Sequence, residues 1–264
     1  MPLREINGVR LLVEESGSGD PLVLVHGSWN DRQAWALIEE DLARRFRVVS
    51  YDRRGHTGSE DSADPGSRRD DEDDLAGLMT TLGLAPAHVV ANSFGSSIAL
   101  GLAARRPELF RTLGAHEPPL VSLAADDPAV ARFGDAVTPV LELIGRGEAE
   151  AAAREFVGIV LGHGAWEMLP EGNRATMVRN ADTFAGEALD PAWADIDLDA
   201  LSRISVPVLL TQGDQSPPMF AAIIARLSAA MESAEVRTYP GAGHVPHTTH
   251  PADYVTMISR FTAS

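Results

Sequence analysis

The chain has 264 residues, of which 44% are hydrophobic and 23% are charged, which is enough apolar material for one sizeable α/β domain with an insertion. Its formal net charge of -16 argues against nucleic acid and anionic membrane surfaces as partners. The absence of cysteine excludes disulfides, and the absence of a signal-peptide core or of an apolar run of ~18 residues predicts a cytoplasmic protein without a membrane span.

The first half of the chain alternates strand and helix patterns. A two-residue turn signal, Asn7-Gly8, predicts a hairpin over residues 3–13. Apolar runs then predict strands at 22–25, 46–50, 88–92 and 112–115. Helical spacing lies between them, at 31–44, 70–82 and 98–106. Continuous apolar strands flanked by helices are typical of a parallel sheet. The acidic run at 70–74 opens a helix and is interpreted as a solvated face rather than a metal site.

The pattern changes between residues 120 and 203. Valine-rich runs give way to Ala/Glu/Arg-rich helical segments interrupted by prolines, which predicts a helical lid over one edge of the sheet. Strand patterns resume at 206–210 and 235–239, with helices at 218–231 and from Pro251 onward. The predicted fold is therefore an α/β, doubly wound, mostly parallel sheet. Its core comprises residues 1–119 and 204–264, and its cap comprises residues 120–203.

The junction at residues 89–97 is the first candidate for chemistry. An apolar strand ends on Ser93 and a helix of small residues begins at once. A strand–serine–helix junction of the form G-x-S-x-G is a nucleophile elbow, although Ala91 stands here in place of the first glycine. Alone, the motif is more typical of a serine that caps a helix, because such short motifs are common by chance.

Further polar residues follow the other predicted strands. The carboxyl ends of parallel strands meet at one edge of a doubly wound sheet, where ligands bind. The residues that fall there are Ser28, Asp52, Ser93, Glu117, Asp214 and His244. This convergence predicts a functional site around Ser93.

Four motifs, in order and in register, resemble the α/β-hydrolase fold superfamily over essentially the full chain. They are His26-Gly27-Ser28-Trp29, residues 51–59, Ala91-Asn92-Ser93-Phe94-Gly95 and Gly241-Ala242-Gly243-His244. The resemblance implies a serine hydrolase with a catalytic triad and a helical lid, without a cofactor or metal. None of the eight histidines shows the H-E-x-x-H spacing of a zinc site.

The resemblance and the chemistry assign roles together. A serine hydroxyl needs a base, and His244 is the candidate, whereas His26 is expected to hold the loop that follows it. The tetrahedral intermediate needs two preorganised N–H donors. The resemblance implies that these come from the backbones of Phe94 and Ser28.

The acid of the triad is where this chain departs from the commonest pattern of the family. The usual position after Gly213-Asp214 holds Ser216, so the remaining candidates are Asp214 and Glu117. Some branches of the family carry their acid after the preceding strand, as Glu117 would. We favour Glu117, with Asp214 as the alternative.

A serine at the elbow excludes the family branches that need an aspartate nucleophile. The expected reaction is hydrolysis of a small ester or lactone through an acyl-Ser93 intermediate. Carbon–carbon bond hydrolysis or perhydrolysis by the same triad is one alternative, and a non-catalytic ligand receptor is another. Aromatic residues predict an apolar substrate pocket, with packing inside the lid as their other interpretation: Trp29, Phe133, Trp166 and Trp193. The sequence leaves a homodimer open.

Overall fold

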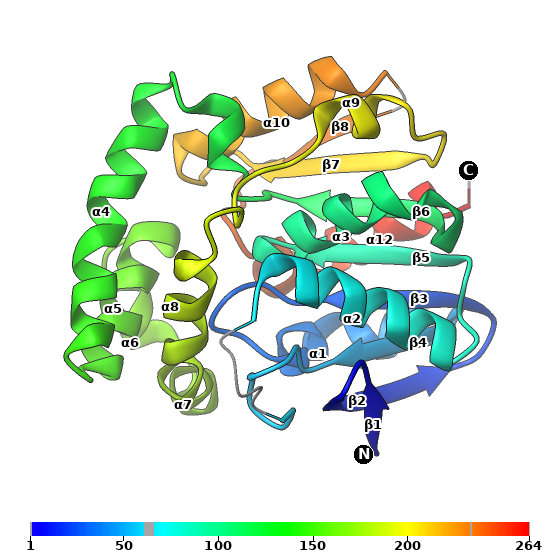
Figure 1. Ribbon diagram of the computed structural model, residues 1–264, viewed down its shortest axis with the longest axis horizontal. Helices are drawn as coiled ribbons and strands as arrows, with labels where there is room; N and C mark the ends of the chain where they lie inside the picture. The colour runs from blue at the N-terminus through cyan, green and yellow to red at the C-terminus, as the bar shows by residue number, and fades with distance from the viewer. Residues whose placement is uncertain (1, 61–65, 233, 264) are drawn as a thin grey trace.

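An eight-stranded sheet runs through the protein in the order β1-β2-β4-β3-β5-β6-β7-β8 (Figure 1). It is seen in a computed structural model that describes residues 2–60, 66–232 and 234–263. The strands are β1 (Leu3–Ile6), β2 (Val9–Gly17), β3 (Asp20–Val25), β4 (Phe46–Tyr51), β5 (Ala87–Asn92), β6 (Phe110–His116), β7 (Val208–Gly213) and β8 (Ala234–Tyr239).

Six of these strands form a parallel sheet, and two antiparallel strands extend one edge. β1 pairs with β2, and β2 with β4, in antiparallel register, whereas all pairings from β4 to β8 are parallel. The turn between Ile6 and Val9 holds Asn7 and Gly8 at φ values of 48° and 80°. Both central residues of a type I′ turn need positive φ, so the Asn-Gly pair closes this hairpin as predicted.

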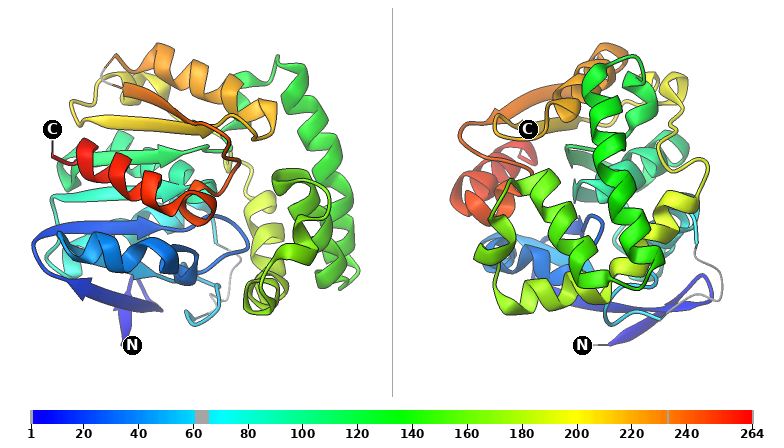
Figure 2. Two further views of the ribbon diagram at one scale, coloured as in Figure 1. Left: turned by 180° about the vertical axis from the view of Figure 1, so that it is seen from behind. Right: turned by 90° about the vertical axis from the view of Figure 1, so that its left-hand side faces the viewer.

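Helices cover both faces of the sheet, as Figures 1 and 2 show from opposite sides. Leucine, isoleucine and alanine side chains of α2, α3 and α10 share one buried cluster with the inner strands. A second cluster on the other face joins the strands to α1 and α12. These helices are α1 (Ala36–Ala43), α2 (Arg68–Thr81), α3 (Phe94–Arg105), α10 (Pro218–Ala230) and α12 (Pro251–Phe261). The doubly wound α/β fold is therefore confirmed.

Helix α2 shows why the acidic run lies where it does. Ser67 caps its first turn and accepts a hydrogen bond from the backbone N–H of Asp70, whose carboxylate accepts one from the Ser67 N–H in return. This capping box satisfies two backbone donors of the helix start and places Asp70 and Asp71 at its positive end. The expected solvated face is wrong for three acids of the run: Asp71, Glu72 and Asp74 are buried and ion-paired with arginines.

The chain between β6 and β7 is helical; its helices α4 to α8 lie beyond the carboxyl ends of the strands, whereas α9 packs against α3 and α10 (Figures 1 and 2). Its helices are α4 (Pro128–Gly145), α5 (Ala149–Leu161), α6 (Ala165–Met168), α7 (Glu171–Arg179), α8 (Ala181–Leu189) and α9 (Leu198–Ser202). A separate apolar cluster joins α4 to α8 around Val140 and Val157. Leu120 and Leu201, near the predicted cap boundaries, instead pack into the core under the sheet. The division into core and cap at 119/120 and 203/204 stays a prediction.

Within the described residues, no helix combines the length and the apolar character that crossing a bilayer requires.

Candidate active site

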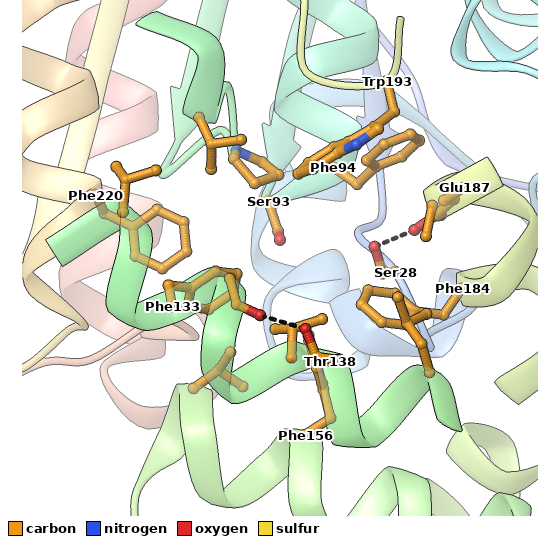
Figure 3. Close-up of a pocket in the computed structure, with 18 of the residues that line it drawn as sticks. Ser28, Ser93, Phe94, Phe133, Thr138, Phe156, Phe184, Glu187, Trp193 and Phe220 are labelled. Carbon is orange, nitrogen blue, oxygen red and sulfur yellow. Dashed lines mark hydrogen bonds between the residues drawn. The ribbon is translucent and has the colours of Figure 1, made fainter. Parts of the chain in front are cut away.

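Ser93 occupies a sharp turn between β5 and α3. Its φ of 55° and ψ of -126° lie outside the conformations that a serine adopts readily. Its backbone N–H donates to the carbonyl of His116 at 2.8 Å, which ties the turn to the end of β6. Strain of this kind persists only where the surrounding structure enforces it, and it is concentrated at functional sites. The side chain of Ser93 thereby points into a pocket that it helps to line (Figure 3).

Two glycines make this turn sterically feasible. A Cβ on Gly95 would lie 2.4 Å from the carbonyl oxygen of Val25, so only glycine lets α3 start this close to β3. A Cβ on Gly27 would lie 2.9 Å from the Cβ of Ser93. The loop after β3 is therefore pressed against the candidate nucleophile.

Glu117 and His244 form the buried pair that such a serine needs. Nδ1 of His244 lies 2.6 Å from Oε2 of Glu117, and the backbone N–H of Gly213 donates to Oε1 at 2.7 Å. Burial alone raises the pKa of Glu117, but the hydrogen bond from His244 and the nearby His116 outweigh it and lower the pKa to about 2. Glu117 is therefore a carboxylate, and it fixes the proton of His244 on Nδ1. Nε2 of His244 is left as the basic atom.

Asp214, the alternative acid, lies elsewhere. Its side chain is exposed and accepts hydrogen bonds from the Gly241 backbone at 2.8 Å and from Gln215 at 3.0 Å. Ser216, at the usual acid position, lies close enough to Glu117 to contribute to the lowering of its pKa. The structure thus brings Glu117, rather than Asp214, against His244.

His26 has a different environment from His244. Its Nε2 accepts the backbone N–H of Arg53 at 3.0 Å, which places the ring proton on Nδ1, 2.8 Å from the carbonyl of Gly27. Burial, together with the charge of Arg53, lowers its pKa to about 3. A neutral ring with both nitrogens engaged is suited to holding the loop, as the sequence predicted.

Three buried residues also raise the question of a metal. His116, Glu117 and His244 offer ligand atoms that lie within 4.8 Å of one another, the one such group among the described residues. However, Glu117 and His244 are already hydrogen-bonded to each other, and Nδ1 of His116 lies 2.9 Å from the hydroxyl of Thr211. The three residues therefore form a hydrogen-bonded pair, Glu117 and His244, with His116 beside it.

The pocket in front of Ser93 has a volume of about 300 Å³ and a mainly apolar lining. Both candidate oxyanion residues, Ser28 and Phe94, line it together with Ser93 and His244. Its aromatic and aliphatic walls come from the helical insertion and from α10: Val121, Val130, Phe133, Val137, Leu141, Phe156, Val160, Phe184, Trp193 and Phe220. The volume and lining suit one small organic molecule.

The four predicted substrate aromatics divide into two groups. Phe133 and Trp193 line the pocket, and their contact with a substrate stays a prediction. Trp29 is fully buried and stacks on Phe156 at 5.2 Å, in the apolar cluster of the helical insertion. Trp166 belongs to the same cluster. The structure thus places Trp29 and Trp166 in packing positions.

Two residues at the pocket were missed by the sequence analysis. The ring of Phe220 stacks on His244 with centroids 4.6 Å apart and an interplanar angle of 16°. Glu187 of α8 accepts a hydrogen bond from the hydroxyl of Ser28 at 2.5 Å (Figure 3) and one from Arg53 at 2.7 Å. Burial, aided by the nearby charge of Asp71, raises the pKa of Glu187 above its ordinary value, although Arg53 and the hydroxyl of Ser28 act against that rise. A carboxylate three residues after Phe184, on an otherwise apolar helix face, was the available signal.

Comparisons with known proteins identify the family of the chain. Residues 22–257 match the alpha/beta hydrolase family, and the chain belongs to that family. It is 29% identical over 269 residues, covering 97% of this chain and 93% of the relative, to a 2-(acetamidomethylene)succinate hydrolase from Mesorhizobium japonicum. Over 110 residues, 40% of this chain and 39% of the relative, it is 41% identical to a 2-hydroxymuconate semialdehyde hydrolase from a Pseudomonas species. The enol-lactonase from Burkholderia xenovorans shares the fold, with a TM-score of 0.77, 23% identity and full coverage of both chains.

Proposed function

We propose that this α/β-hydrolase is a cofactor-independent serine hydrolase that cleaves an ester or lactone. One observation carries the proposal: the strained Ser93 and a His244 paired to a buried Glu117 open onto the same apolar pocket. A nucleophile, a base and a group that orients the base are the three parts that acyl transfer through a serine requires.

The reaction follows from the orientation of these groups. Nε2 of His244 takes the proton of the Ser93 hydroxyl while its oxygen attacks the substrate carbonyl, and Glu117 stabilises the resulting imidazolium. The backbone N–H groups of Ser28 and Phe94 stabilise the oxyanion. The imidazolium then returns the proton to the leaving alkoxide, and an acyl group remains on Ser93. From an ester the alkoxide departs as the alcohol, whereas from a lactone it stays attached as the hydroxyl end of the opened ring. Water, deprotonated by His244, attacks this acyl-enzyme, and the acid is released as Ser93 recovers its proton.

Labelling and turnover test this proposal together. A fluorophosphonate probe should modify Ser93, as mapped by mass spectrometry, and short p-nitrophenyl esters should be hydrolysed. Ser93→Ala should abolish both. Ser205→Ala, at an exposed serine remote from the pocket, serves as the control and should change neither. A protein that neither reacts with the probe nor turns over esters would count strongly against the hydrolase and favour the alternative of a ligand receptor.

Carbon–carbon bond hydrolysis is the second candidate, supported by the 41% identity to the 2-hydroxymuconate semialdehyde hydrolase. That similarity covers 40% of the chain. The two reactions are separated by comparing kcat/KM for 2-hydroxymuconate semialdehyde with that for a p-nitrophenyl ester. A value for the semialdehyde that exceeds that of every ester and lactone tested would favour carbon–carbon cleavage.

A further inference from the structure

The pocket beside Ser93 carries an uneven distribution of charge. Among the described residues that line it, Glu187 is the one carboxylate, and none is an arginine. The sequence contains no lysine, and the residues outside the described ranges include no basic residue. A substrate carboxylate bound in this pocket would therefore find no cationic side chain in its walls.

Glu187 itself is only partly neutralised. Its side chain is 8% exposed, and its Oε1 lies 2.7 Å from Nη2 of Arg53. The same guanidinium also holds Asp71, at 3.0 and 3.2 Å. One arginine between two carboxylates leaves a surplus of negative charge at the pocket wall.

Arg53 is screened from the pocket by an aromatic ring. Its guanidinium lies over the ring of Phe94, 4.9 Å from the centroid, and Phe94 lines the pocket. Arg53 lines the neighbouring cavity instead, together with Arg54 and Asp71. The Arg53 side chain is 1% exposed, and its Nε and Nη2 donate to Asp71 and Glu187, whereas its buried Nη1 has no hydrogen-bond partner among the described residues. Arg53 is not among the residues that line the pocket beside Ser93.

From this arrangement we infer that Glu187 is a specificity-determining residue that restricts the site to substrates whose acyl part is uncharged. The inference rests on the proposed hydrolase function and narrows its substrate class to neutral esters or lactones with an apolar acyl group. Such a group gains from burial against the phenylalanines and valines of the pocket. A carboxylate would lose its hydration without gaining a counter-ion, and would meet the charge of Glu187. The Mesorhizobium japonicum relative, by contrast, is named for a succinate, which carries two carboxylates.

A pair of nearly isosteric esters tests the inference. Phenyl hexanoate and monophenyl adipate differ in that a carboxylate replaces the terminal methyl group. Near neutral pH we expect wild-type kcat/KM to favour the hexanoate by at least about 100-fold, the scale set by burying an unpaired charge. In Glu187→Gln this ratio should fall by at least about tenfold. Glutamine keeps the size of the side chain but removes the charge that repels the substrate carboxylate. It also leaves the positive charge of Arg53 less compensated. The ratio is insensitive to a general loss of activity.

The matched control is Asp182→Asn, the same change of charge on the exposed face of α8. Its ratio should equal that of the wild type. Hydrolysis of both esters by the wild type within about threefold would overturn the inference, whether or not Glu187→Gln folds. If the ratio of the two kcat/KM values is the same in Glu187→Gln as in Asp182→Asn, Glu187 does not determine the specificity. Failure of the proposed hydrolase function gives a different result, in which Ser93 is not labelled and neither ester is cleaved. That result would overturn the inference as well.

Discussion

Nδ1 of His244 lies 2.6 Å from Oε2 of Glu117, although 127 positions separate the two residues in the chain. The contact depends on the backbone of Glu117, whose φ of 47° turns the chain at the end of β6. Its other carboxylate oxygen is held by the backbone of Gly213, at the end of β7. The end of β6 thus sets the direction of the Glu117 side chain and the end of β7 holds Oε1, which leaves Oε2 to orient the imidazole of His244.

Glu117→Gln is therefore expected to lower kcat by up to about 10⁴-fold, because an amide neither selects the productive tautomer of His244 nor stabilises its cation. Steady-state kinetics with a p-nitrophenyl ester measures the loss. Asp214→Asn is the matched control and should remain within a few-fold of wild type, since Asp214 contacts Gly241 and Gln215 in the exposed loop. An active Glu117→Gln beside an inactive Asp214→Asn would reverse the assignment of the acid.

Gly95→Ala should damage both stability and activity. The added Cβ would lie 2.4 and 2.5 Å from the carbonyl oxygens of Val25 and His26, and these backbone atoms cannot rotate away. Overpacking of this kind costs about 1–3 kcal/mol in the free energy of unfolding, and the shift would displace Ser93 from the loop opposite it. Urea unfolding and ester turnover measure the two effects.

Gly158→Ala in α5 is the control for that substitution. A Cβ there meets nothing within 4 Å, so the higher helix propensity of alanine should stabilise the protein by about 1 kcal/mol. Equal unfolding free energies for Gly95→Ala and the wild type would show that α3 can move away from β3 at little cost.

The sequence predicts best those features that neighbouring residues decide. Asn7-Gly8 sets its hairpin through local backbone preferences, and the apolar strand before Ser93 leads directly into the elbow. Glu117 could be favoured because it follows a buried strand and because Ser216 occupies the usual acid position. These features depend on order along the chain, which a single sequence contains.

The pocket wall depends on how the helical insertion lies over the sheet, and a single sequence does not give that orientation. Trp166 and Phe133 are both aromatic residues of the insertion, yet one is packed inside it and the other faces Ser93. The local sequence shows Glu187 as a carboxylate on an apolar helix face, but its contacts with Ser28 and Arg53 span 159 and 134 positions, so these partners cannot be predicted from it.

The two aromatics should consequently respond differently to truncation. Phe133→Ala removes apolar wall from the pocket, and we expect a loss of about tenfold or more in kcat/KM for phenyl hexanoate with a small change in stability. Trp166→Ala leaves a cavity in the packed cluster and should cost about 3–5 kcal/mol in the free energy of unfolding. Parallel kinetics and urea titrations separate the outcomes. A large loss of catalytic efficiency in a stably folded Trp166→Ala would place Trp166 in the binding site after all.

Acid sensitivity of the fold should depend on His247, which is buried against Trp35 and Tyr254. Burial, aided by His116 and His244, lowers its pKa to about 3, whereas an unfolded histidine titrates near its ordinary value of 6.5. Below pH ~6.5, His247 therefore binds a proton in the unfolded chain but not in the folded chain. The folded state consequently loses stability relative to the unfolded state as the pH falls from neutral. The loss attributable to His247 is about 2 kcal/mol between pH ~7 and ~5.

His247→Phe preserves an aromatic ring at this position and removes the titrating group. Urea unfolding at the two pH values should show a pH-dependent loss of stability smaller by about 2 kcal/mol than in the wild type. His163→Gln, at an exposed histidine of the helical insertion, is the control and should keep the wild-type dependence. If His247→Phe loses as much stability between the two pH values as the wild type does, proton uptake by His247 on unfolding is not a source of the acid sensitivity.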